Sequence, residues 1–202
     1  MAACLCLGPT GSGKTLLLKR LQSTSVNEGT STVETVGSNI IRVPKKPVAE
    51  GSGATSSSSR GGEDKDFLSI QEIGGAMAPL WPSYFAPDKL IMYVIDSSNL
   101  FQVSISTVLL MELLSHEKLV GAKVLILLTK MDLTNRKNLN YLKFMMRLDT
   151  ILAQSGRRVS LLEVSATTGD GLEDVRRWLL LNWPRVKKAA NTIKAAARSD
   201  NG

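Results

Sequence analysis

The stretch ACLCLGPTGSGKTLLLKRLQ, residues 3–22, decides the fold. Its centre, GPTGSGKT at residues 8–15, matches the phosphate-loop pattern G-x-x-x-x-G-K-[ST] at every fixed position. The apolar residues 2–7 before it predict a buried strand, and Lys14–Gln22 predicts a helix with its leucines on one face. A strand before the loop and a helix after it are the setting that this motif requires, so the match indicates a phosphate-binding site.

The chemistry of this loop follows from its residue types. Glycines let the backbone curl so that several N–H groups point at phosphate oxygens, and the helix N-terminus adds its positive dipole end. We expect the Lys14 ammonium to reach the β- and γ-phosphates of a nucleoside triphosphate and the Thr15 hydroxyl to ligate Mg²⁺. The predicted phosphate-binding residues are Gly8, Pro9, Thr10, Gly11, Ser12, Gly13, Lys14 and Thr15. The motif does not select the base.

Short apolar runs alternate with helical stretches along the rest of the chain. This pattern is typical of a mainly parallel sheet that helices cover on both faces. Besides the strand at 2–7, strands are predicted at residues 39–43, 67–73, 90–96, 123–128 and 159–164. Helices are predicted at residues 14–22, 108–114, 139–152 and 172–181. The fold class is therefore α/β, with three layers in the order α/β/α.

Two polar segments that follow predicted strands indicate guanine as the base. Residues 129–132 (TKMD) come directly after the strand at 123–128, and residues 165–167 (SAT) follow the last strand. Ligands bind at the carboxyl ends of strands in such sheets. An Asp132 carboxylate there would accept hydrogen bonds from the N1–H and 2-amino groups of guanine, which adenine does not offer in that arrangement. The Lys130 stem would pack along the base.

These two segments resemble motifs of the Ras-like GTPases. T-K-x-D is similar to their N-K-x-D motif, and S-A-T is similar to the S-A-[KLT] loop whose backbone contacts guanine O6. The resemblance implies a set of base-binding residues, which are Thr129, Lys130, Asp132, Ser165, Ala166 and Thr167.

The middle of the chain resembles the ADP-ribosylation factor (Arf) branch of the Ras superfamily. Residues 71–75 (QEIGG), with PLW and YF following at 79–81 and 84–85, resemble its W-D-V-G-G…P-L-W…Y-F segment. TVGSN at 35–39 resembles its P-T-x-G-F-N, and VIDSS at 94–98 its V-V-D-S strand end. The resemblance implies a Ras-like phosphate-loop fold: a six-stranded, mostly parallel sheet with one antiparallel edge strand and about five helices.

The same resemblance implies a GTP-binding regulatory switch. Such a protein binds GTP or GDP with Mg²⁺ and signals to effector and regulator proteins in intracellular membrane or ciliary traffic. Thr35 would ligate Mg²⁺ alongside Thr15, and the Gly75 N–H would bind the γ-phosphate, so that both switch loops are ordered by GTP and released after hydrolysis. Glu72 stands where the family has Asp, and its extra methylene still allows a water-mediated contact to Mg²⁺.

The catalytic position departs from the family pattern. Ala76 stands where the family has the Gln that orients the attacking water, and a methyl group cannot do this. We therefore assign no firm catalytic residue beyond Lys14, which would stabilise phosphate charge, and we expect a nominal GTPase that is slow without a partner. An open alternative is that another residue, such as Gln71, positions the water.

Charge and composition divide the chain. Residues 1–184 are expected to form the GTPase domain, and the Ser/Gly-rich residues 50–64 are expected to form a disordered insertion between the switches. Residues 185–202 form a basic tail, which carries much of the net charge of +7. This tail either contacts an anionic membrane or partner surface or is a solvated basic face. The basic run begins within the last predicted helix and comprises Arg176, Arg177, Arg185, Lys187, Lys188, Lys194 and Arg198.

Other features limit the location and the partners. No apolar run approaches the roughly 18 residues of a membrane span, and no secretory signal is recognisable. Only residues 1–7 precede the phosphate loop, so the N-terminal amphipathic helix of the family is not expected. Cys4, Cys6 and His116 do not provide the spacing of a zinc site. We expect a cytoplasmic monomer, peripheral on membranes if the tail binds lipid, that binds no nucleic acid.

Two other functions fit parts of the pattern. A small phosphate-loop nucleotide kinase could share GPTGSGKT, but no arginine-rich lid segment is recognisable for a second phosphorylated substrate. A nucleotide-locked or nucleotide-independent interaction module could keep the fold, but it would not need to retain Gly13, Lys14 and Thr15.

Overall fold

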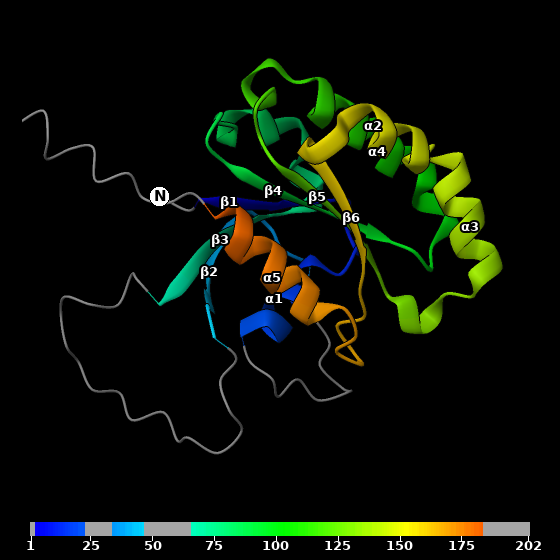
Figure 1. The fold of residues 1–202 in the computed structure, drawn as a ribbon, viewed down its shortest axis with the longest axis horizontal. Helices are drawn as coiled ribbons and strands as arrows, with labels where there is room; N and C mark the ends of the chain where they lie inside the picture. The colour runs from blue at the N-terminus through cyan, green and yellow to red at the C-terminus, as the bar shows by residue number, and fades with distance from the viewer. Residues whose placement is uncertain (1–2, 23–33, 47–65, 184–202) are drawn as a thin grey trace, which may run out of the picture.

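The structure is a computed structural model that describes residues 3–22, 34–46 and 66–183. Its core is one six-stranded sheet with the strand order β2-β3-β1-β4-β5-β6 (Figure 1). All neighbouring strands are parallel except β2 and β3 at one edge, which confirms the predicted sheet. The strands are β1 (Cys4–Leu7), β2 (Ser38–Pro44), β3 (Phe67–Ile73), β4 (Leu90–Asp96), β5 (Val124–Thr129) and β6 (Val159–Glu163).

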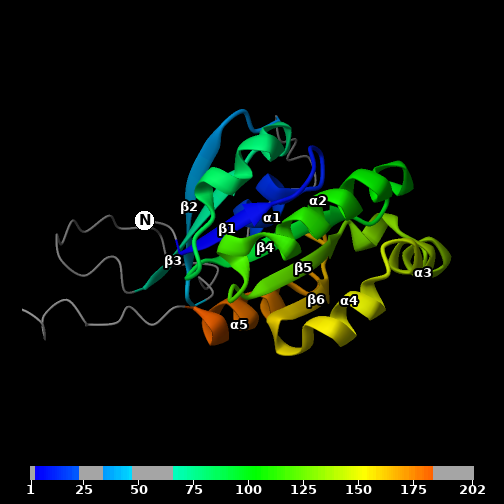
Figure 2. The same ribbon diagram turned by 90° about the horizontal axis from the view of Figure 1, so that it is seen from above.

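Helices cover both faces of this sheet, as the α/β/α prediction requires (Figure 2). Within the described ranges the α-helices are α1 (Lys14–Gln22), α2 (Val103–Ser115), α3 (Arg136–Met145), α4 (Leu148–Ser155) and α5 (Leu172–Asn182). Short 3₁₀ segments join them, namely η1 (Gly75–Tyr84), η2 (Leu100–Gln102), η3 (Glu117–Leu119), η4 (Met131–Leu133) and η5 (Gly156–Arg158).

Side chains along β1 alternate between the two helical layers that cover the sheet. Cys4 and Cys6 pack with the apolar face of α1 and α5, whereas Leu5 and Leu7 pack with α2, α3, α4 and η1. Strands β4 and β5 are buried at every residue because side chains on both of their faces meet a helical layer. Burial raises the pKa of both cysteine thiols, so the reactive thiolate is disfavoured while β1 stays in the sheet.

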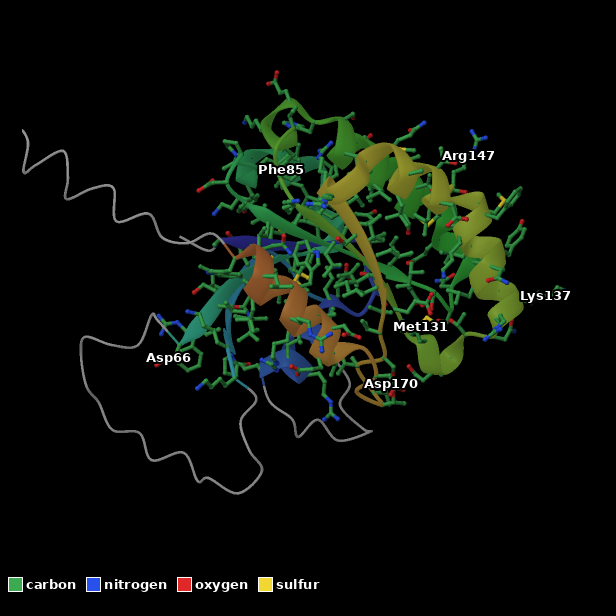
Figure 3. All side chains as sticks on the ribbon, in the orientation of Figure 1. Asp66, Phe85, Met131, Lys137, Arg147 and Asp170 are labelled. Carbon is green, nitrogen blue, oxygen red and sulfur yellow. The ribbon has the colours of Figure 1, made fainter. Side chains whose placement is uncertain are left out.

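The single helix predicted at residues 139–152 is wrong, because the structure has two helices there. Arg147, labelled in Figure 3, adopts a left-handed backbone conformation (φ 51°) between α3 and α4. Its N–H bonds to the Phe144 carbonyl at 3.0 Å, which closes a tight turn. The apolar pattern runs through the break because Leu142, Met146 and Leu148 are all fully buried, so periodicity alone did not reveal it.

The proposed insertion at 50–64 and the basic tail at 185–202 lie outside the described residues. Arg176, however, is described, and it is not part of a solvated basic face. Its guanidinium is buried and donates to the carbonyl of Pro44 in β2 and, at 3.0 Å, to that of Leu21 in α1. Arg176 therefore fastens α5 to two other elements, while its neighbour Arg177 makes a surface ion pair with Asp174.

We expect Arg176→Met to lower the free energy of unfolding by about 2–3 kcal/mol, because two carbonyls lose their donor where water has little access. Urea unfolding followed by circular dichroism measures this change. Arg177→Met is the matched control, and it should cost under about 1 kcal/mol because its ion pair is exposed. Equal losses in the two variants would contradict the role assigned to Arg176.

Candidate nucleotide-binding site

The phosphate loop connects β1 to α1 in a conformation that only glycine tolerates at several positions. Gly8 has φ 147°, and a Cβ there would lie 2.2 Å from the Val94 carbonyl oxygen of β4. Lys14 is buried, and its Nζ donates to the carbonyls of Gly8 and Pro9, each at 2.8 Å. The lysine thus holds the loop closed around its own ammonium group.

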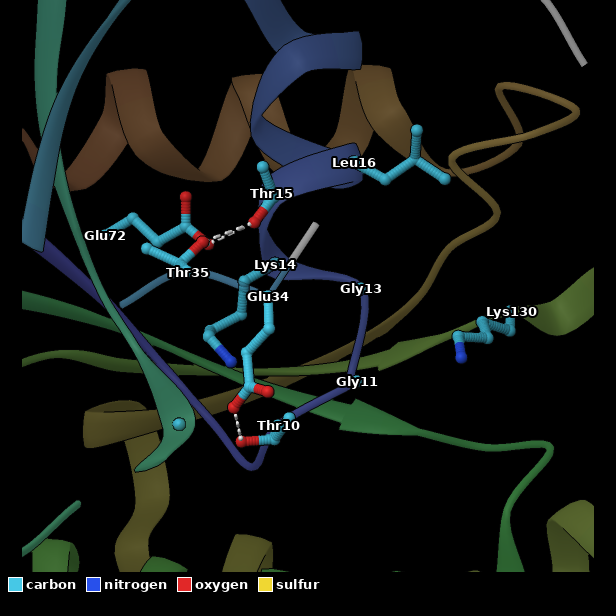
Figure 4. Close-up of a pocket in the computed structure, with 11 residues that line it drawn as sticks. Thr10, Gly11, Gly13, Lys14, Thr15, Leu16, Glu34, Thr35, Glu72 and Lys130 are labelled. Carbon is cyan, nitrogen blue, oxygen red and sulfur yellow. Dashed lines mark hydrogen bonds between the residues drawn. The ribbon is translucent and has the colours of Figure 1, made fainter. Parts of the chain in front are cut away.

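The electrostatics of Lys14 favour an anion. Burial lowers the pKa of its ammonium, and the neighbouring carboxylates of Glu72 and Glu34 oppose that shift. The loop borders a pocket of about 430 Å³ (Figure 4). Its lining residues are Thr10, Gly11, Gly13, Lys14, Thr15, Leu16, Glu34, Thr35, Glu72, Gly75 and Lys130. A phosphate group there would meet a buried cation together with the N-terminus of α1.

Three side chains from separate segments meet beside Lys14. Thr15 donates to Glu72 Oε1 at 2.5 Å, and Thr35 donates to the same oxygen at 3.2 Å. The two hydroxyl oxygens lie 3.0 Å apart. Glu72 is fully buried, and its second oxygen, Oε2, has no hydrogen-bond partner among the described residues. The structure therefore brings together the two predicted metal-binding threonines and the carboxylate that was expected to contact Mg²⁺ through water.

This oxygen cluster fits Mg²⁺. Mg²⁺ prefers oxygen ligands and is usually held by one or two protein groups together with water and substrate phosphates. In the described parts of the chain, no group of three or more His, Cys, Asp or Glu side chains forms a complete metal site. The hydroxyls of Thr15 and Thr35 and the carboxylate of Glu72 suit Mg²⁺ that is also held by a phosphate.

Gly74 and Gly75 join two segments across the pocket. Gly74 N donates to the Gly37 carbonyl at 2.9 Å, and a Cβ on Gly74 would lie 2.2 Å from the Thr35 carbonyl oxygen. A Cβ on Gly75 would lie 2.2 Å from the Thr10 nitrogen. The end of β3 thus touches the segment at 34–38 on one side and the phosphate loop on the other.

The predicted base-binding residues meet at the ends of β5 and β6. Thr129 Oγ1 donates to the carbonyls of Ser12 (2.7 Å) and Ile95 (3.0 Å), which ties β5 to the phosphate loop. Ser165 Oγ donates to Asp132 Oδ1 at 2.5 Å and orients that carboxylate. Of the predicted base-binding residues only Lys130 lines the pocket itself. Ala166 is buried and Thr167 is exposed, in the loop that Ser165 begins.

Figure 3 shows how these loops come together. Met131 and Asp170 belong to the loops after β5 and β6, and their labels mark the same edge of the sheet. The Met131 N–H donates to the Val164 carbonyl at 3.3 Å, which connects the two loops directly. Because parallel strands end at the same edge of a sheet, the ligand-binding groups that follow them lie together at that edge.

Sequence reasoning missed three contacts at this site. Asp96 Oδ2 lies 2.7 Å from Lys130 Nζ, and its position at the end of a buried strand was the available signal. Gln102 Nε2 donates to the Thr10 carbonyl at 3.1 Å, and Glu34 Oε1 accepts from Thr10 Oγ1 at 3.2 Å. These last two contacts depend on tertiary structure, and no motif in the sequence marks them.

Neither Ala76 nor Gln71 is placed to position an attacking water in the pocket. Ala76 is exposed at the start of η1 and carries only a methyl group. Gln71 precedes Glu72 in β3, so its side chain points to the opposite face of the sheet, where its amide donates to Ser38 Oγ at 3.4 Å. Gln71 does not line the pocket.

Comparison with known proteins identifies the family. Residues 62–183 match the ADP-ribosylation factor family. The chain is 37% identical over 183 residues to ADP-ribosylation factor-like protein 16 of Homo sapiens, covering 87% of this chain and 83% of that protein. This chain belongs to the ADP-ribosylation factor family. It is also 28% identical to ADP-ribosylation factor-like protein 1 of Drosophila melanogaster over 177 residues, which are 87% of this chain and 85% of that protein.

A solved small GTPase structure shares the fold. The Arl6 BBS3 small GTPase from Trypanosoma brucei, with the bound nucleotide analogue GppNp, superposes with a TM-score of 0.64 at 18% identity. The match covers 89% of this chain and 96% of that one. This Arf-family chain thus shares the fold of that small GTPase, and its phosphate loop occupies the expected place between β1 and α1.

We expect Gly75→Ala to weaken GTP binding about tenfold relative to GDP binding, a difference of about 1.4 kcal/mol. The added methyl would collide with the Thr10 nitrogen and push the start of η1 away from the loop. Competition between labelled GTP and GDP measures the ratio of dissociation constants. Gly121→Ala is the control, because a Cβ at Gly121 meets nothing within 4 Å. An unchanged ratio in Gly75→Ala would contradict this expectation.

Proposed function

We propose that this Arf-family protein is a GTP-regulated switch whose two nucleotide-sensing segments are residues 34–38 and the start of η1. The observation that carries the proposal is the contact of Gly74 and Gly75 with both Thr35 and the phosphate loop. A γ-phosphate in the pocket would adjoin all three segments. Its loss on hydrolysis would remove the group that holds them together.

Each residue of the phosphate end has a distinct role in this proposal. Lys14 and the backbone of residues 8–15 bind the β- and γ-phosphates, and the Gly75 N–H binds the γ-phosphate. Thr15 and Thr35 would hold Mg²⁺ through their hydroxyl oxygens, and Glu72 accepts hydrogen bonds from both hydroxyls. Mg²⁺ held there would supply positive charge beside the phosphates.

The loops after β5 and β6 would bind guanine. Asp132 would accept from the N1–H and 2-amino groups, and its hydrogen bond with Ser165 fixes its orientation. Lys130 would pack along the base, with its ammonium held by Asp96 at 2.7 Å. Thr129 would connect this end to the phosphate loop through Ser12. The backbone of residues 165–167 would contact O6.

We expect Asp132→Asn to convert the preference from GTP to xanthosine triphosphate by about two orders of magnitude or more. Xanthine replaces the 2-amino donor with a carbonyl acceptor, and an asparagine amide offers the matching donor. Competition binding with the two nucleotides measures the preference. Retained preference for GTP in the variant would show that Asp132 does not read the base. Asp170→Asn, in the neighbouring loop, is the control and should keep the preference for GTP.

Hydrolysis by this protein is proposed to be slow, because neither Ala76 nor Gln71 supplies an amide to the attacking water. We expect Ala76→Gln to raise the single-turnover hydrolysis rate by about tenfold or more. The position is exposed, so the fold accepts the larger side chain. Phosphate release from preloaded GTP measures the rate. A rate that does not increase would place water positioning elsewhere in the protein.

Two measurements on the purified protein test the central proposal. The nucleotide that co-purifies with it is released and identified, and the hydrolysis of loaded GTP is then followed through one turnover. Guanine nucleotide held mainly as GTP, with hydrolysis slow enough to follow over hours, supports the switch. Bound adenine nucleotide, or no binding of any nucleotide with Mg²⁺ present, contradicts it.

We further propose that effectors and regulators bind near the sensing segments. Val36, Ile40 in β2 and Leu80 in η1 are exposed apolar side chains there (94%, 57% and 55% exposed), which supports a protein-binding surface. The proposed setting is the cytoplasm and membrane traffic, and family membership is what supports it. No helix in the described residues is long and apolar enough to cross a membrane. The tail at 185–202 is proposed to contact anionic membrane.

A further inference from the structure

Glu34 brings a carboxylate to the phosphate pocket. Its Oε1 accepts a hydrogen bond from Thr10 Oγ1 at 3.2 Å, and its side chain lines the pocket together with Lys14. Figure 4 shows the Glu34 carboxylate directed at Thr10 beside the Lys14 side chain. The negative charge of Glu34 acts on the Lys14 ammonium, which agrees with this placement.

Glu34 lies next to a residue that the site holds in place. Thr35 contacts Thr15 and Glu72, and the preceding residue, Glu34, lines the same pocket. Thr10 of the phosphate loop, which is the partner of Glu34, also adjoins Gly75. The Glu34 carboxylate therefore lies at the end of the pocket where Lys14, Thr35 and Gly75 would surround a γ-phosphate.

We propose that Glu34 is the catalytic residue that orients the attacking water, in place of the glutamine that is absent at position 76. This inference rests on the proposed GTP-binding function. The water would donate a hydrogen bond to Glu34, which turns its lone pair toward the γ-phosphorus. Thr10 would hold the carboxylate in place through its hydroxyl.

The proposed step balances as a simple hydrolysis. A bond forms between the water oxygen and the γ-phosphorus while the bond from that phosphorus to the β–γ bridging oxygen breaks. The electron pair of the broken bond leaves on GDP. The proton from water passes to the transferred phosphate and leaves on the released inorganic phosphate, so the charge of Glu34 does not change.

Other described side chains near the pocket do not offer this group. The pocket lining contains two carboxylates, and the second, Glu72, is engaged by Thr15 and Thr35. Gln102 uses its amide N–H to bond the Thr10 carbonyl, and its amide oxygen is buried. Gln102 lines the neighbouring groove between η1 and α2 instead.

A rival effect of the same carboxylate is repulsion of the γ-phosphate. Lys14 and a bound cation would offset that repulsion but not remove it. The two effects predict different outcomes when the negative charge of Glu34 is removed. Loss of a water-orienting carboxylate slows hydrolysis, whereas relief of repulsion alone strengthens GTP binding and leaves the rate unchanged.

The test uses full-length protein and the variants Glu34→Gln and Glu34→Ala, with Glu112→Gln as the matched control. Glu112 is an exposed glutamate in α2 that lines the neighbouring groove but not the phosphate pocket. For each protein, the dissociation constants for GTP and GDP are measured first, and then single-turnover hydrolysis at saturating Mg²⁺. Thermal unfolding checks that every variant is folded.

We expect both Glu34 variants to bind GTP at least as tightly as wild type and to hydrolyse it about tenfold more slowly or slower still. Glu112→Gln should match wild type in both measurements. Ala76→Gln should raise the rate by a larger factor in Glu34→Gln than in wild type, because the two side chains position the same water. A merely structural role for Glu34 predicts the same factor in both backgrounds.

Three results would overturn the proposal. Glu34 variants that bind GTP and hydrolyse it at the wild-type rate would exclude the role while leaving the GTP switch intact. A wild-type rate equal to that of GTP in solution would show that no residue performs this step. Failure of wild type to bind GTP at all would instead remove the proposed function on which the inference rests.

Discussion

The hydrogen bonds of Glu72 with Thr15 and Thr35 are the contact on which the rest of the site depends. Glu72 belongs to β3, Thr15 to α1, and Thr35 to the segment before β2. One buried carboxylate oxygen thus holds three segments that are far apart in the sequence. A buried carboxylate is costly unless it is hydrogen-bonded, so these contacts and the fold support each other.

The sheet explains why Glu72 can lie there. In β3 it faces Cys6 of the parallel strand β1 and Asn39 of the antiparallel strand β2, so its backbone is fixed from both sides. The strand then ends at Gly74 and Gly75, which lack the side chains that would keep neighbouring backbone away. The pocket is therefore a product of strand register, and the loops around it take their positions from that register.

Local sequence was enough to predict the parallel core and the phosphate loop, since buried strands such as Leu90–Asp96 are continuous apolar runs and the loop is a contiguous motif. It was not enough for Arg147, whose left-handed conformation lies within an unbroken apolar pattern. Arg176 looked like part of a basic run because its two carbonyl partners come from distant elements. Asp96 and Glu34 were missed for the same reason: their partners, Lys130 and Thr10, are 34 and 24 residues away.

The contrast between Gly74–Gly75 and Ala76 has an evolutionary consequence. Any side chain at the two glycines would collide with backbone, so mutation there damages the fold as well as the site. The next position projects outward, where a substitution leaves the packing unchanged. In the proposed switch, a change at position 76 would therefore alter turnover without touching the geometry that senses the nucleotide. The duration of a signal and the recognition of the nucleotide would then be set at separate positions.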